Sequence, residues 1–88
     1  MEASLQHSSQ IGDSLQKFDS EIVDAHARGD GRRLAHLYAG AAHYLFERGE
    51  LDQAAFLFVN AYVWALEAGE DGLSAEARGI LAKMGREY

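Results

Sequence analysis

The stretch Leu51–Leu66, LDQAAFLFVNAYVWAL, decides the fold because it predicts a helix with apolar side chains around most of its circumference. At about 100° per residue, one face consists of Leu51, Ala54, Ala55, Phe58, Ala61, Tyr62 and Ala65. Further apolar side chains flank this face, Leu57 and Trp64 on one side and Val59, Val63 and Leu66 on the other. A helix of this kind is buried from more than one direction. We therefore expect a surface from outside the chain to cover part of it.

The composition limits the classes of protein to which the chain can belong. A chain of 88 residues fits one small domain. It contains no cysteine, which excludes disulfides, thiolate metal sites and thiol catalysis. The net charge of −6 leaves no basic field for phosphates, so no nucleic acid partner is expected. The longest apolar run, Ala54–Val59, is far shorter than the roughly 18 residues of a membrane span. No secretory signal pattern is visible either, so we expect a cytoplasmic protein with no membrane contact.

Apolar spacing and capping residues predict an all-α fold of four antiparallel helices, at about 13–28, 32–48, 51–68 and 74–85. Residues 1–12 are rich in Ser and Gln and are expected to form a flexible N-terminal arm. A single helical domain is then expected over 13–88. Asp13 and Asp30 are the expected caps of the first two helices.

Glycines mark the expected helix ends. Gly29, Gly49 and Gly69 follow the first three helices and can adopt the left-handed conformation that terminates a helix. Because the connection after Gly49 is very short, the second and third helices should be antiparallel neighbours. After Gly69 we expect a turn over 70–73, with Ser74 or Asp71 capping the last helix.

The two middle helices carry a pattern known from a repeat family. Tyr38-x2-Ala41-Ala42-x2-Leu45, followed by Ala54-x3-Phe58 and Ala61, resembles the tetratricopeptide repeat (TPR) family, whose paired helices carry aromatic-x2-Leu-Gly-x2-Tyr and Ala-x3-Phe. The resemblance covers about residues 32–68. Ala41 stands where the family has leucine and Leu45 where it has tyrosine, and no proline ends the second helix. A generic antiparallel helical bundle is the alternative interpretation.

The resemblance implies TPR-like helix-turn-helix hairpins that bind other proteins. Repeats of this kind normally need at least about three units to bury their faces. A chain with one full unit must therefore be completed in one of two ways. Either the flanking helices cap the hairpin, or a second copy docks against it.

One polar group has the spacing of a metal site. His36, His43 and Glu47 fall on one side of the second helix, and imidazoles with a carboxylate can bind zinc. A fourth ligand could come from Glu21, Asp24 or His26 on the first helix. The alternative interpretation is a solvated polar face opposite a buried one. No nucleotide, phosphate or calcium motif is present, so we expect neither an enzyme nor a cofactor.

The candidate partner-binding residues are Phe56, Val59, Asn60, Val63 and Trp64 on the third helix. Phe56 lies beside the polar residues of that helix, where the core of the chain is least able to cover it. The sequence thus predicts a small non-catalytic protein–protein interaction module of TPR-like hairpins that self-associates as a homodimer. A metal- or small-ligand-binding bundle that uses His36, His43 and Glu47 is the alternative function. A structural adaptor of one larger complex would have the same sequence features as the interaction module.

Overall fold

The computed structural model describes residues 16–86, which form helices and contain no strand. An N-terminal helix covers residues 16–28. It is followed by α2 (Gly31–Glu47), α3 (Leu51–Ala68) and α4 (Asp71–Lys83). The all-α fold predicted from the sequence is confirmed. The helix start expected at Asp13 and the arm expected over 1–12 lie outside the described residues.

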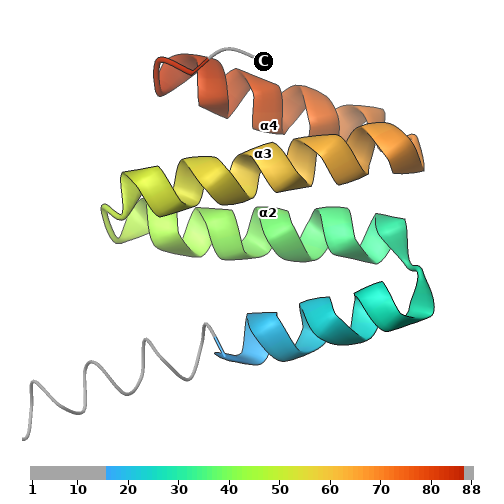
Figure 1. The fold of residues 1–88 in the computed structure, drawn as a ribbon. Coiled ribbons are helices and arrows are strands. Elements are labelled where there is room, and N and C mark those ends of the chain that lie inside the picture. Colours follow the sequence, from blue (N-terminus) through green and yellow to red (C-terminus); the bar gives the residue numbers. More distant parts are fainter. Residues whose placement is uncertain (1–15, 87–88) are drawn as a thin grey trace, which may run out of the picture.

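The helices lie side by side in the order of the sequence, and the chain reverses direction at each turn (Figure 1). α3 packs against both α2 and α4. The molecule is a flat array with principal extents of 46 × 33 × 15 Å. In so thin an array each helix keeps part of its surface away from its neighbours. None of the helices in the described part of the chain combines the length and apolar character that crossing a bilayer requires.

Within residues 16–86, the turn after each of the four helices uses the same hydrogen-bond pattern. The glycine of each turn has a positive φ, between 67° and 80°. The N–H of the residue after the glycine donates to the carbonyl five residues earlier, which pairs Asp30 with Ala25, Glu50 with Leu45, Glu70 with Ala65 and Arg86 with Leu81. This arrangement is the Schellman motif, which satisfies the free carbonyls of a helix end. In the first three turns the carbonyl of the same acidic residue accepts the first hydrogen bond of the next helix.

The start of α4 corrects the sequence prediction. The turn expected over 70–73 is wrong, because α4 begins at Asp71 with Glu70 as its N-cap residue. The Schellman turn at Gly69 needs only one residue before the next helix can start. Ser74 is buried within α4, and its hydroxyl donates to the Asp71 carbonyl at 3.0 Å instead of capping the helix. The cap expected at Asp30 is confirmed, since its Oδ1 accepts from the Arg33 N–H at 3.1 Å.

The core consists of two clusters of buried side chains. The larger joins α2, α3 and α4 around Phe58 and contains Ala42, Leu45, Ala54, Ala55, Phe58, Ala77 and Leu81. The smaller joins the N-terminal helix to α2 through Ala25, Leu34 and Leu37. Alanines at the α2–α3 contact let the helix axes approach, while Phe58 fills the remaining volume. The N-terminal helix therefore docks on a cluster of its own, apart from the main core.

Candidate interaction surface

The outer side of α3 exposes large apolar side chains. Phe56 is 68% exposed and Val63 is 45% exposed. They are seven residues apart, so they lie on the same side of the helix, two turns from each other. Asn60 lies between them, and its Nδ2 donates to the Phe56 carbonyl at 3.0 Å. We call Phe56, Asn60 and Val63 the α3 face.

The other two candidate residues lie against their own chain. Trp64 is half-buried and packs on the smaller core cluster, with its ring edge-to-face to His26 at 5.5 Å between centroids. A Cβ at Gly31 would meet the Trp64 ring at 3.4 Å, so α2 also approaches this side chain closely. Val59 is partly buried against the main cluster. Three of the five predicted residues therefore form the α3 face, in which Phe56 and Val63 are exposed and Asn60 is partly buried. The N-terminal helix and α2 cover much of Trp64.

An apolar groove adjoins Phe56. It has a volume of about 410 Å³ and is lined by Leu45, Asp52, Gln53, Phe56 and Leu57. It extends the apolar surface of α3 toward α2 through Leu45, which is a core residue. Leu66, 53% exposed, adds a further apolar side chain near the other end of α3. The sequence placed Leu66 among the apolar flanks of the helix but not among the partner-binding residues.

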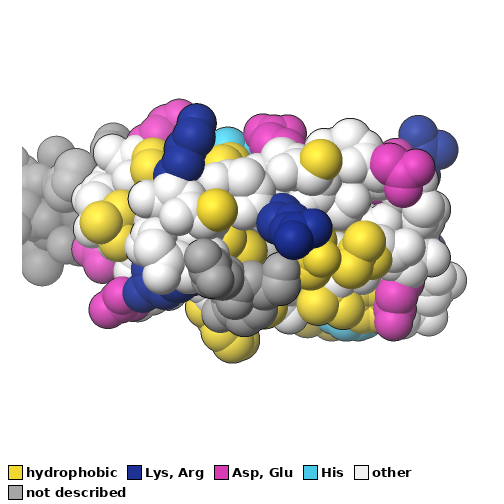
Figure 2. Space-filling model, turned by 90° about the horizontal axis from the view of Figure 1, so that it is seen from above, with side chains coloured by type: hydrophobic (Ala, Val, Ile, Leu, Met, Phe, Trp, Pro, Cys, Tyr) yellow, Lys and Arg dark blue, Asp and Glu magenta, His cyan; other side chains and the backbone are white. Residues whose placement is uncertain are grey.

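The α4 edge of the array has a different character. Seen from above this edge, hydrophobic side chains lie among acidic and basic ones, and several of them gather in the right half of the view (Figure 2). The large exposed hydrophobic side chains of α3 are Leu51, Phe56, Val63 and Leu66, and none of those identified in residues 16–86 belongs to α4. The apolar surface available to a partner is therefore concentrated on α3.

An ion pair holds the C-terminal end of α4 to the start of α3. Arg86 Nη2 lies 2.7 Å from Asp52 Oδ1. Asp52 borders the groove beside Phe56, so a positive charge stands next to the apolar surface. No sequence pattern indicates this pair, because residues 34 positions apart meet only through the packing of α4 on α3.

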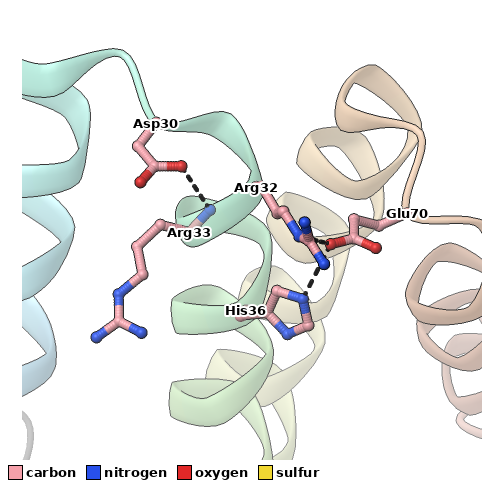
Figure 3. A network of polar contacts seen from close by, with 5 residues as sticks. All are labelled: Asp30, Arg32, Arg33, His36 and Glu70. Atoms are coloured by element: carbon pink, nitrogen blue, oxygen red, sulfur yellow. Dashed lines mark hydrogen bonds and ion pairs between the residues drawn. The ribbon is translucent and has the colours of Figure 1, made fainter.

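The two histidines of α2 contact two different carboxylates. His36 Nε2 lies 3.3 Å from Glu70 Oε1, and Arg32 also forms an ion pair with Glu70 (Figure 3). His43 Nε2 lies 3.3 Å from Glu76 Oε1 on α4, and its ring stands edge-to-face to Phe58 at 5.0 Å. The hydrogen bond from His36, together with the hydrogen bond and charge of Arg32, lowers the pKa of Glu70 below its ordinary value. His36 thus connects α2 to the N-cap residue of α4, and His43 connects α2 to α4 itself.

The candidate metal ligands do not form a common site. No group of three or more His, Asp or Glu side chains within residues 16–86 could hold a metal ion. Of the candidate fourth ligands, Glu21 lies 3.7 Å from Arg33 and Asp24 forms an ion pair with Arg28 at 2.8 Å. His26 Nε2 is 3.3 Å from the Tyr38 hydroxyl. The polar side of α2 is organised as separate contacts between helices.

Comparison of the chain with protein-family models, with curated proteins and with solved structures finds no match. The TPR resemblance therefore stays a prediction from the sequence. The function has to be inferred from the geometry of α3 and its neighbours.

Proposed function

We propose that this protein is a non-catalytic interaction module that binds a protein partner through the α3 face and self-associates by the same face. The observation that carries the proposal is the 68% exposure of Phe56. Covering a side chain of this size is worth about 2 kcal/mol. Large aromatic side chains are also enriched where proteins bind one another.

The α2–α3 hairpin supports the proposed kinship with TPR-like modules. Ala42, Leu45, Ala54 and Phe58, which carry the resemblance, are all buried in the main cluster. At these positions small residues bring the helices together, and Phe58 fills the space between them. The hairpin then serves as a rigid support for the α3 face. A cytoplasmic location is part of the same proposal.

Light scattering coupled to size-exclusion chromatography tests the proposal. We expect the mass of the wild-type protein to rise with concentration from one chain toward two. Phe56→Ser should shift the equilibrium toward the monomer, because it removes the largest exposed apolar group. Val23→Ser is the matched control, since Val23 is 67% exposed but lies on the N-terminal helix. A wild-type mass of one chain at every concentration, unchanged by Phe56→Ser, would contradict self-association.

A further inference from the structure

We propose that the partner on the α3 face is α3 of a second copy, packed antiparallel about a two-fold axis that passes between Val59 and Asn60. This inference rests on the proposed function and specifies its partner and register. A two-fold interface uses the same patch on both subunits, so the patch must be complementary to itself. In the proposed register, the apolar residues and the charged residues of α3 are each complementary to those of the second copy.

The apolar residues set that register. Phe56 and Val63 are equally far from the point midway between Val59 and Asn60. In an antiparallel pair centred there, Phe56 of one copy lies opposite Val63 of the other, and the contact occurs twice. Val63 of the second copy then lies over Phe56, at the mouth of the groove lined by Leu45 and Leu57. Both exposed side chains of the face are thus covered together.

The charges fit the same register. It brings Glu67 of one copy to the level of Asp52 of the other, and two carboxylates alone would repel each other. Asp52, however, holds Arg86 at 2.7 Å, and Glu67 forms no ion pair with another residue in the described part of the chain. Arg86 therefore supplies the positive charge that Glu67 of the second copy needs. A parallel pair would instead bring Glu67 against Glu67.

The size of the contact predicts a weak dimer. At 1.5 Å per residue, α3 with its 18 residues is about 27 Å long. One such helix from each copy buries less than the roughly 1,600 Å² of a standard stable interface. We expect dissociation in the micromolar range or weaker, with dimers forming as concentration rises.

Single-cysteine variants test the geometry cleanly, because the natural chain has no cysteine. A disulfide requires Cα atoms within about 7 Å. Asn60→Cys lies next to the axis and should form disulfide-linked dimers under mild oxidation. Gln53→Cys should not, since its two copies would be about 20 Å apart along the helices at 1.5 Å per residue. A mixture of Asp52→Cys with Glu67→Cys should give the mixed dimer, because these two positions lie opposite each other in the proposed register. Val23→Cys serves as the background control.

The outcomes separate this inference from the proposed function. Cross-linking of Asn60→Cys, Gln53→Cys and Glu67→Cys to equal extents would show a parallel pair and overturn the inference. If Asn60→Cys cross-links no faster than Val23→Cys while light scattering still shows a dimer sensitive to Phe56→Ser, the register is wrong but the α3 face remains the interface. If light scattering shows only monomer for the wild-type protein and for Phe56→Ser, the inference and the self-association in the proposed function are both overturned.

A charge-reversal variant tests the proposed contact between Glu67 of one copy and Arg86 of the other. Glu67→Lys would place a positive charge against Arg86 of the second copy, twice per dimer. We expect the dissociation constant to rise about 5- to 30-fold, the effect of two exposed ion pairs. Glu47→Lys makes the same change of charge at an exposed position on α2 and should leave the constant within about twofold. An equal effect of both variants would show that only net charge matters and overturn the contact between Glu67 and Arg86.

Discussion

At the scale of the residue, two phenylalanines two positions apart have opposite roles. Phe58 is 1% exposed and lies at the centre of the main cluster, whereas Phe56 is 68% exposed on the outer side of the same helix. Position on the helix alone separates them, because successive residues turn by about 100°. Phe58 belongs to the fold, and Phe56 is available to a partner.

This difference predicts opposite effects on stability. Phe58→Ala should lower the free energy of unfolding by about 3–5 kcal/mol, because it leaves a cavity in the core. Phe56→Ala should change that free energy by less than about 0.5 kcal/mol when measured at a concentration where the protein is monomeric. Urea unfolding followed by circular dichroism measures both. A loss above about 2 kcal/mol for Phe56→Ala would mean that this side chain stabilises the monomer and is not free for a partner.

At the scale of the element, the turns define where each helix starts and stops. Gly69 has a φ of 73°, which other residues adopt only at a cost. Gly69→Ala should destabilise the protein by about 1–2 kcal/mol. Gly79 provides the control, since it lies within α4 and a Cβ there would meet nothing within 4 Å. Gly79→Ala should therefore stabilise the protein by about 0.5–1 kcal/mol, and thermal unfolding of the two variants should shift in opposite directions.

The contacts of His36 and Arg32 with Glu70 should make the stability of the protein depend on pH. Because the pKa of Glu70 is lowered in the folded state, its charged form stabilises the fold above the pKa of the unfolded chain, and that contribution is lost as pH falls through the folded pKa. Wild-type protein should be more stable than Glu70→Gln at pH 7, and the difference should disappear at acidic pH. Chemical denaturation between pH 7 and pH 3 measures this trend.

The matched control for this prediction is Glu50→Gln. Glu50 occupies the same position in the preceding turn and likewise forms no side-chain cap. Unlike Glu70, it forms no ion pair with any residue of the described 16–86. Glu50→Gln should therefore show little change across the same pH range. A similar pH dependence in both variants would mean that His36 and Arg32 do not control the stability contributed by Glu70.

Most of the helix ends could be predicted from the sequence, because they depend on local chemistry. The stops at Gly29, Gly49 and Gly69 and the cap at Asp30 need only neighbouring residues, and the structure confirms them. The start of α4 was missed although a local signal exists. Each of these glycines is followed by an acidic residue, and each lies 20 positions after the one before. That regularity would have placed the last helix directly after Glu70.

Contacts between helices could not be predicted in the same way. The sequence grouped His36 and His43 because helical spacing puts them on one side of α2, but it carries no information on which carboxylates α4 brings to them. The same is true of Trp64, whose cover depends on where the N-terminal helix docks. Periodicity identifies which face of a helix is apolar. Only the packing of the other helices decides how much of that face remains exposed.

At the scale of the whole molecule, the array consists of a main unit and one attached helix. The main cluster joins α2, α3 and α4, whereas the N-terminal helix rests on α2 through Ala25, Leu34 and Leu37. Such an arrangement allows the attached helix to separate while the rest stays folded. Trp64, the only tryptophan of the chain, lies at this junction. Its fluorescence should therefore report on the docking of the N-terminal helix.

A charge introduced beneath the N-terminal helix tests whether this helix can separate while the main unit stays folded. Ala25 is fully buried, so Ala25→Glu would bury an unpaired carboxylate or force the N-terminal helix away. We expect the Trp64 emission to shift to longer wavelength, while far-ultraviolet circular dichroism loses only the signal of the first helix and a cooperative unfolding transition remains. Ala27→Glu is the matched control, being the same change at an exposed position of the same helix. Loss of all helical signal in Ala25→Glu would show that the array folds as one unit, because the main cluster could not then persist without the helix that docks beside it.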